Sequence, residues 1–295
     1  MNRIGLALGG GGAKGFAHIG VLRALEELSI FPDLVSGSSI GGVVAALYAA
    51  GLSVERIEAS LRATGLTIFA AREPSRLGLV GRAKLITWLG NLLGDVTFDQ
   101  LPRKLAVMAV DLEAGTEVIL DRGRVMDAVL ATTAFPGLFA PVERDGRYLI
   151  DGGALNNVPF DVARQMGADY VIASDVLSHR APLFQNPALA ARPVESVVRQ
   201  LLFRSGAESL WEVVDRTITI MQEGHVKDKM RTCPPDVMVY PEVGQVALFD
   251  VRQFETCLAA GVASVQSHQV ELVRLRARAM RKTGKRSMKL GAASI

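Results

Sequence analysis

The sequence predicts an α/β fold, a three-layer α/β/α sandwich around a mostly parallel central sheet. Short apolar segments that end at glycine or serine alternate with longer segments whose apolar residues recur at helical spacing. Strand, glycine loop, helix, strand, turn and helix follow one another in a βαβα order, and such crossovers are right-handed. The 295-residue chain has neither an internal repeat nor an evident linker, so we expect one domain.

The composition is that of a globular protein with a sizeable core. Hydrophobic residues make up 49% of the chain and charged residues 21%. The two cysteines, Cys233 and Cys257, have no metal-ligand spacing and imply no disulfide framework. The N-terminal residues lack the apolar stretch of a signal peptide, and no run of about 18 apolar residues predicts a spanning helix. We therefore expect a cytoplasmic protein.

The net charge of +3 has its basic excess at the end of the chain. We expect a folded domain over residues 1–273 and a basic tail over residues 274–295. A solvated tail is the simpler interpretation. The alternative is peripheral contact with an anionic membrane, where each basic residue contributes about 1 kcal/mol. Nucleic acid is not an expected partner, because no interleaved aromatic residues or known module accompany the charge.

The first predicted strand, residues 4–8, runs into a glycine loop over residues 9–15, and a helix is predicted over residues 18–28. The loop fits the dinucleotide pattern Gly-x-Gly-x-x-Gly. However, the acidic residue expected near the end of the second strand is missing, which argues against NAD or FAD. Free N–H groups of such a loop can instead hold a developing oxyanion. A tight turn without a ligand is the structural alternative.

Residues 37–41 read Gly-Ser-Ser-Ile-Gly, a G-x-S-x-G pattern between a short apolar strand and an apolar helix over residues 42–50. This is the strand, turn and helix context of a nucleophile elbow. Gly37 and Gly41 leave room for a crowded backbone turn, and the helix N-terminus favours negative charge at Ser39. Gly/Ser-rich turns before helices are common, so the pattern needs support from a base.

The middle of the chain continues the alternation. We expect a helix over residues 52–66 with Ser53 as its N-cap. Residues 70–95 are apolar but broken by glycines, and form either core-packing helices or a mobile cover over the site. We expect a strand at 105–111 to pair with residues 117–120 through a turn at 114–115, and a short helix follows. Its predicted range is 124–132.

A strand at residues 147–150 leads into Asp151-Gly152-Gly153. Asp151 then lies at the carboxyl end of a strand, where open α/β sheets bind ligands. Because Ser39 also follows a strand, we expect both side chains at the same edge of the sheet. Aspartate before two glycines is also a routine turn. Beyond it we expect a strand at 169–175, a loop at 187–193, a helical region at 193–230, a strand at 237–240 and a closing helix at 249–277.

A serine hydroxyl needs a base, usually histidine. The chain has four histidines: His18, His179, His225 and His268. An α/β-hydrolase order would use Ser39, Asp151 and then His225 or His268, but that fold has several strands before the elbow and this chain has one. His225 lies in a charged stretch and His268 on a predicted surface helix, so we expect both to be structural. Asp151 then remains as the direct proton acceptor for Ser39.

Three motifs occur in one order: Gly10-Gly11-Gly12-Ala13-Lys14-Gly15, Gly37-Ser38-Ser39-Ile40-Gly41 and Asp151-Gly152-Gly153. In this the chain resembles the patatin-like phospholipase family. Four intervening segments resemble bacterial members: residues 110–112, 134–139, 156–159 and 166–169. The resemblance extends over about residues 4–260. It implies that residues 1–273 form a patatin-like catalytic domain.

The resemblance implies a lipid acyl hydrolase, a phospholipase A, lysophospholipase or carboxylesterase, that acts on phospholipids or lysophospholipids. Ser39 would be the nucleophile and Asp151 the base, the loop of residues 10–15 would supply the oxyanion hole, and no metal or cofactor would be needed. Lys14 departs from the family's usual arginine and lacks the guanidinium fork. The alternatives are an acyltransferase or thioesterase with the same dyad, and a non-catalytic nucleotide-binding regulatory protein. The oligomeric state is left open.

Overall fold

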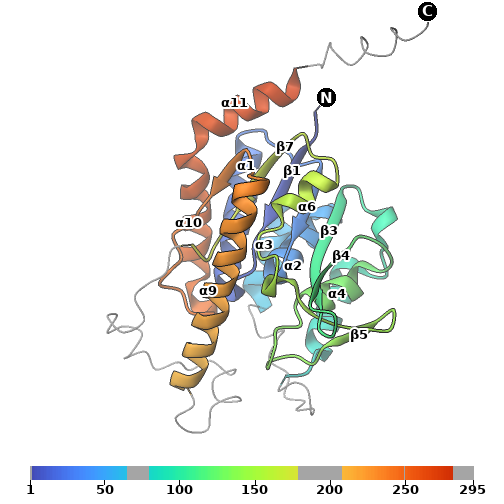
Figure 1. Cartoon of the computed structure of the whole chain (residues 1–295). Helices are drawn as coiled ribbons and strands as arrows, with labels where there is room; N and C mark the ends of the chain where they lie inside the picture. The colour runs from blue at the N-terminus through green and yellow to red at the C-terminus, as the bar shows by residue number, and fades with distance from the viewer. Residues whose placement is uncertain (1, 65–79, 179–207, 249, 282–295) are drawn as a thin grey trace, which may run out of the picture.

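The structure, a computed structural model, describes residues 2–64, 80–178, 208–248 and 250–281. In these ranges an eight-stranded sheet has the order β5-β6-β3-β2-β1-β7-β8, with β4 also paired to β3 (Figure 1). The five parallel strands are, in sheet order, β3 (Lys104–Asp111), β2 (Leu34–Gly37), β1 (Ile4–Leu8), β7 (Tyr170–Ser174) and β8 (Val237–Val239). The antiparallel strands are β4 (Thr116–Leu120), β5 (Val142–Arg144) and β6 (Arg147–Asp151).

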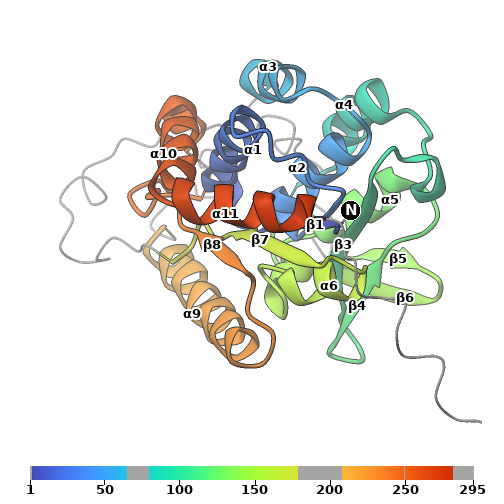
Figure 2. The same ribbon diagram turned by 90° about the horizontal axis from the view of Figure 1, so that it is seen from above.

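Helices cover both faces of the sheet, which confirms the predicted sandwich. Figure 2 shows α6 and α9 on one side and α1, α2, α3 and α10 on the other. The helices are α1 (Ala17–Glu27), α2 (Ser39–Ala49), α3 (Val54–Thr64), α4 (Ala83–Leu93), α5 (Val125–Thr132), α6 (Phe160–Gln165), α9 (Glu208–Thr232), α10 (Phe254–Ser267) and α11 (Gln269–Met280). In the part of the chain that the structure describes, four short 3-10 helices join them: η1 (Gly12–Phe16), η3 (Phe98–Gln100), η4 (Gly152–Ala154) and η5 (Val251–Gln253).

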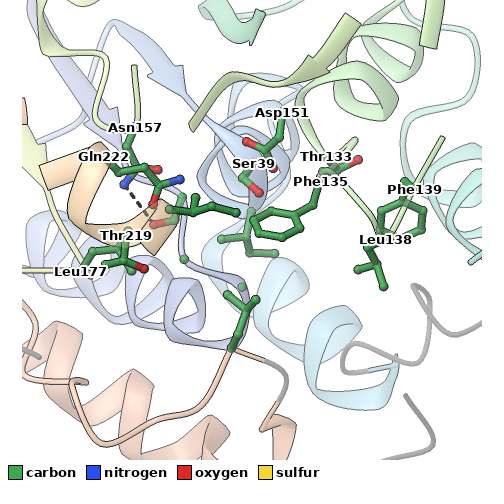
Figure 3. Close-up of a pocket in the computed structure, with 16 residues that line it drawn as sticks. Ser39, Thr133, Phe135, Leu138, Phe139, Asp151, Asn157, Leu177, Thr219 and Gln222 are labelled. Atoms are coloured by element: carbon green, nitrogen blue, oxygen red, sulfur yellow. Dashed lines mark hydrogen bonds between the residues drawn. The ribbon is translucent and has the colours of Figure 1, made fainter. Parts of the chain in front are cut away.

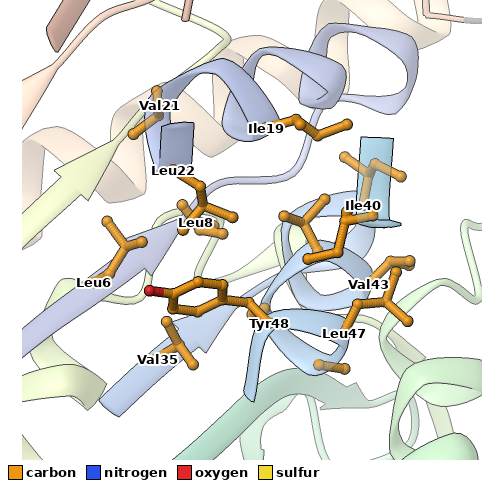
Figure 4. Packing of buried hydrophobic residues seen from close by; sticks show 14 of the residues in the cluster. Leu6, Leu8, Ile19, Val21, Leu22, Val35, Ile40, Val43, Leu47 and Tyr48 are labelled. Carbon is orange, nitrogen blue, oxygen red and sulfur yellow. The ribbon is translucent and has the colours of Figure 1, made fainter. Parts of the chain in front are cut away.

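The core is divided by the sheet into two layers because successive strand residues point to opposite faces. Leu6 and Leu8 pack with the large cluster that includes α1 and α2 (Figure 4), whereas Ala7 packs with α6 and Val226 of α9. All five residues of β1 are buried. An uninterrupted apolar run is what a strand covered on both faces requires.

Several predicted elements are found close to their expected positions. The hairpin of β3 and β4 is confirmed by its antiparallel register, and Ser53 Oγ accepts the Arg56 N–H at 3.3 Å as a helix cap. Strand β5 was not expected. Within residues 70–95, the described helix α4 buries Leu85 and Trp88 in the core, which agrees with the core-packing interpretation for that part. Residues 70–79, the predicted loop at 187–193 and His179 lie outside the described residues.

The end of the chain differs from expectation. The predicted closing helix is two helices, α10 and α11, that join at His268, where Nδ1 lies 2.9 Å from the Ser264 carbonyl oxygen. Leu272, Leu275 and Ala279 are buried, and the Asn2 N–H donates to Ala279 O at 3.2 Å. The boundary predicted at 273/274 therefore falls inside a packed helix. No helix in the described ranges is long and apolar enough to cross a membrane.

Candidate active site

Strand β2, which leads to Ser39, and strand β6, which ends at Asp151, meet end to end along β3. Gly37, the last residue of β2, pairs with Val107 of β3, and Asp151, the last residue of β6, pairs with Ala109. Strand β4 pairs with both Val107 and Ala109 from the other edge of β3, so β2 and β6 must share one edge. Their carboxyl ends thus face each other across two residues of β3, about 7 Å.

Ser39 and Asp151 meet for a different reason from the one that the sequence predicts. We expected Asp151 at the same sheet edge as Ser39 because both follow strands of a parallel sheet. Strand β6 is antiparallel to β3, so its carboxyl end points the other way. The two side chains still meet, because β3 continues four residues beyond Val107 and β6 pairs with that extension.

Ser39 occupies a strained turn between β2 and α2. Its φ is +52°, in the left-handed region that side chains other than glycine rarely adopt. A Cβ on Gly37 would lie 2.5 Å from the Gly41 carbonyl oxygen, and one on Gly41 would lie 2.3 Å from the Leu8 carbonyl oxygen. Neighbouring backbone atoms therefore leave no room for a side chain at either position, as predicted. Ser38 is buried and donates its hydroxyl to the Asn156 carbonyl oxygen.

Asp151 is a buried carboxylate beside Ser39 (Figure 3). Its Oδ1 accepts the Gly153 N–H at 2.8 Å, whereas its buried Oδ2 has no hydrogen-bond partner among the described residues. Burial raises the pKa of Asp151 to about 6, against the opposing effects of the Ser39 side chain and the Gly153 N–H. The Ser39 side chain thus lowers the pKa of Asp151, although it forms no well-aligned hydrogen bond with Oδ2.

The end of α5 connects the elbow to the aspartate. Thr132 Oγ1, which is buried, accepts the Ser39 N–H at 2.9 Å. Two residues later, the Ala134 carbonyl oxygen accepts the Asp151 N–H at 3.0 Å. One short segment therefore fixes the backbones of both site residues. The role of this segment could not be predicted from the sequence, because a threonine at the end of an apolar helix carries no distinctive signal.

The glycine loop packs directly against the elbow. A Cβ on Gly10 would lie 3.0 Å from Ser39 Cβ, and one on Gly15 would lie 2.2 Å from a methyl group of Ile40. Gly12 has a φ of +57°. Glycine at these positions lets the loop approach the nucleophile closely, as its predicted role requires.

Only part of this loop has free N–H groups. Gly10 donates to the Asn157 carbonyl oxygen at 3.2 Å, Ala13 to Leu248 O at 2.8 Å and Lys14 to Gly11 O at 3.2 Å. No described group accepts the N–H of Gly11 or Gly12. Of the predicted set, Gly10, Gly11 and Gly12 line the pocket, whereas Ala13, Lys14 and Gly15 do not. The candidate oxyanion donors are thus narrowed to Gly11 and Gly12.

His18 is hydrogen-bonded to the start of the glycine loop. Its Nε2 donates to the Gly9 carbonyl oxygen at 2.7 Å, so Nδ1 is the bare nitrogen that faces the Ser174 hydroxyl at 3.1 Å. The ring is fully buried, and burial lowers its pKa to about 4 despite the bond to Gly9. His18 is therefore neutral near pH 7 and structural. His225 on α9 and His268 do not line the pocket, as expected.

The pocket at Ser39 is narrow, about 70 Å³. Its polar side chains form two groups, one with Asp151 and Thr133 beside Ser39 and one with Asn157, Thr219 and Gln222, and its remaining walls are apolar side chains (Figure 3). The apolar wall consists of Ile40, Phe135, Leu138, Phe139, Leu177, Ile218 and Leu248. The polar side chains are Ser39, Thr133, Asp151, Asn157, Thr219 and Gln222. Such a lining suits an apolar chain with one polar group at its reacting end.

Asn156 and Asn157, which the sequence marks only through the family resemblance, both contact the elbow or its loop. Asn157 Nδ2 donates to the Gly10 carbonyl oxygen at 3.3 Å. Asn156 Nδ2 donates to Glu117 Oε2 and Asp161 Oδ1, each at 3.0 Å. Lys229 of α9 binds the same two carboxylates at 2.9 and 2.6 Å. This network anchors the segment that follows Asp151 to β4, α6 and α9.

Similar proteins are found by family model, by sequence and by structure. Residues 6–164, just over half of the chain, match the family model described as patatin-like phospholipase. An uncharacterized NTE family protein of Mycobacterium tuberculosis is 38% identical over 193 residues, 65% of this chain and 52% of the relative. Patatin-like phospholipase domain-containing protein 6 of Homo sapiens is 36% identical over 183 residues, 59% of this chain and 13% of the relative.

The chain thus spans about half the length of the mycobacterial relative and a small part of the human one. Among solved structures, VipD from Legionella pneumophila is similar with a TM-score of 0.50 and 15% sequence identity. The likeness covers 93% of this chain and 67% of the VipD chain. At that identity it supports the fold alone.

Proposed function

The chain belongs to the patatin-like phospholipase family, and from that premise we propose that it is a serine hydrolase of lipid acyl esters, with phospholipids or lysophospholipids as substrates. The observation that carries the proposal is the pairing of Ser39 with Asp151. A strained serine at a helix N-terminus lies beside a buried carboxylate whose Oδ2 has no partner in the described structure. A carboxylate with a pKa of about 6 is ionised at neutral pH and still basic enough to accept a proton.

In the first half of the reaction, Ser39 Oγ attacks the ester carbonyl carbon while Asp151 accepts the hydroxyl proton. The tetrahedral intermediate carries a negative oxygen, and the unused N–H groups of Gly11 and Gly12 are suited to bind it. Asp151 then returns the proton to the leaving alcohol, which leaves the acyl group on Ser39. In the second half, water attacks the acyl carbon and Asp151 accepts its proton. The Ser39–acyl bond then breaks, Asp151 returns the proton to Ser39 Oγ, and the fatty acid leaves.

The apolar wall of the pocket suits the acyl chain. Phe135, Leu138 and Phe139 lie on the Thr133 side of Ser39, and Leu177 and Leu248 lie near the glycine loop. Arg82 lies with its guanidinium carbon 5.7 Å from the Phe139 ring centre and donates to the Ala140 carbonyl oxygen, which holds this part of the wall. A volume of about 70 Å³ accommodates a short segment of chain near the ester.

Two rival functions use the same residues differently. An acyltransferase or thioesterase would share the acyl-enzyme but pass the acyl group to another acceptor or take it from a thioester. A nucleotide-binding regulator would use the glycine loop as an anion cradle. The position of Ser39 against that loop, with Ser39 Cβ 3.0 Å from the Cβ site of Gly10, favours chemistry at the serine over nucleotide binding.

The test is fatty-acid release from a panel of phospholipids, lysophospholipids and their thioester analogues by the wild type, Ser39→Ala and Asp151→Asn. We expect release by the wild type and a loss of at least about 10³-fold in each variant. Added glycerol or lysophospholipid as acceptor identifies a transferase by the appearance of a new ester. Nucleotide binding without release from any substrate would contradict the hydrolase.

A further inference from the structure

Two buried oxygen atoms in the pocket have no hydrogen-bond donor among the described residues: Asp151 Oδ2 and Asn157 Oδ1. The proposed chemistry explains the first and says nothing of the second. Asn157 is only 1% exposed, and a buried acceptor left unpaired costs about 1–3 kcal/mol. A group that brings donors into the pocket would satisfy both atoms.

The orientation of the Asn157 amide is set by its neighbour. Nδ2 lies 3.3 Å from the Gly10 carbonyl oxygen, which can only accept a hydrogen bond. The reverse assignment would place two acceptors against each other. Oδ1 is therefore the atom that remains without a donor, and Asn157 presents an acceptor to the pocket.

The Asn157 oxygen lies near both members of the proposed dyad. A Cβ built on Gly10 would be 2.6 Å from Asn157 Oδ1 and 3.0 Å from Ser39 Cβ. A Cβ built on Gly153 would be 2.8 Å from Asn157 Oδ1 and 3.1 Å from Asp151 Oδ1. Asn157 Oδ1 is thus at most about 6 Å from Asp151 Oδ1, and the unpaired Oδ2 belongs to the same carboxylate. One water with two ordinary hydrogen bonds joins acceptors about 4.5–5.5 Å apart, which is compatible with this upper limit.

We propose that Asn157 Oδ1 and Asp151 together bind the water that removes the acyl group from Ser39. This inference rests on the proposed function. Water brings two O–H donors, one for each acceptor, and keeps a lone pair for attack. Its oxygen bonds to the acyl carbon, and Asp151 takes one proton. Asn157 Oδ1 accepts the other O–H, which stays with the oxygen and becomes part of the fatty acid. When the Ser39–acyl bond breaks, Asp151 returns its proton to Ser39 Oγ.

Asn157 also holds Gly10, so a simple loss of activity would not separate the two roles. The acylation half of the reaction provides the separation. Loss of the clamp on the glycine loop would slow acylation and deacylation alike, because both pass through an oxyanion. Loss of the water acceptor would slow deacylation alone.

The experiment measures both rates with a p-nitrophenyl ester of a medium-chain fatty acid by rapid mixing, for the wild type and Asn157→Ala. We expect the ratio of deacylation to acylation rate to fall about tenfold or more. The variant should then give a burst of nitrophenol followed by a slow phase, with the acyl group detected on Ser39 by mass spectrometry. Added hydroxylamine, a stronger nucleophile than water, should speed turnover of the variant more than that of the wild type.

A second variant provides a control in case Asn157→Ala does not fold. Asn157→Asp keeps the shape and an acceptor but loses the Nδ2 donor, so at pH 9 its ratio should stay within about threefold of the wild type. An unchanged ratio in Asn157→Ala would overturn the inference, as would an equal fall in Asn157→Asp. Absence of any acyl-enzyme in the wild type would instead contradict the proposed function.

Discussion

Gly37 and Asp151 pair with the same edge of β3 at positions two residues apart, although they end strands that run in opposite directions. The proposed nucleophile and base are therefore brought together by backbone pairing and not by a side-chain contact. Thr132 and Ala134 at the end of α5 bind the two backbones from a third element. The site is built from rigid elements, which is what a preorganised catalytic pair needs.

Thr132→Val should lower kcat with little change in KM. Valine has a similar shape but cannot accept the Ser39 N–H, and a lost buried hydrogen bond costs about 1–3 kcal/mol, or roughly 5- to 150-fold. Thr132→Ser keeps the hydroxyl and should recover most of the rate. Steady-state kinetics on one ester measures both variants. A valine variant as active as the wild type would show that the hydrogen bond from the Ser39 N–H to Thr132 does not contribute to catalysis.

The activity should fall as the pH is lowered through about 6. Burial raises the pKa of Asp151 to about that value, and only the ionised carboxylate can take the Ser39 proton. A profile of kcat/KM between pH 4.5 and 9 should therefore have an acid limb near pH 6. A flat profile over pH 5–8 would mean that Asp151 is not the base.

The same carboxylate should reduce stability at neutral pH. Its folded-state pKa is raised, so the protonated form favours the fold below pH 3.8, and this contribution is lost as the pH rises through about 6. Asp151→Asn should be more stable than the wild type at pH 8, by up to about 3 kcal/mol. The difference should vanish near pH 4. Urea unfolding of both proteins at the two pH values tests this, and a constant difference would contradict it.

Ser39→Gly should be more stable than Ser39→Ala by about 1 kcal/mol, although both are inactive. The φ of +52° at this position disfavours any residue with a Cβ, and glycine adopts it without strain. Thermal unfolding of the two variants gives the comparison. Equal stabilities would indicate that the turn relaxes once the hydroxyl is gone.

A truncation that tests the membrane role of the basic tail has to leave α11 intact. Removal of everything after Leu272 would delete Leu275 and Ala279, which are packed in the core, so the fold itself would be damaged. Truncation after Arg281 leaves α11 intact. It should weaken binding to anionic vesicles at low salt and have little effect at high salt. Equal binding of the full-length and truncated chains at low salt would contradict membrane contact by the tail.

The sequence predicted the layers and the parallel strands, because apolar periodicity and glycine punctuation are local signals. It also predicted that Ser39 meets Asp151, but from the wrong premise that both follow strands of a parallel sheet. It could not predict that β6 is antiparallel, because the direction of a short strand depends on which partner it pairs with. The predicted tail boundary falls inside α11, because Arg274, Arg276 and Arg278 read as tail charge although Leu275 and Ala279, which alternate with them, are buried in the core. Thr132, His18 and Asn157 act through hydrogen bonds to distant backbone, which no local pattern records.

The central claim is that Asp151 activates Ser39, and covalent labelling tests it most directly. The protein is treated with a fluorophosphonate, which reacts with activated serines, and the modified peptide is identified by mass spectrometry for the wild type and Asp151→Asn. We predict labelling of the wild type at Ser39, and labelling at least about 100-fold slower in the variant. Labelling of another serine, or an equal rate at Ser39 in both proteins, would contradict the dyad.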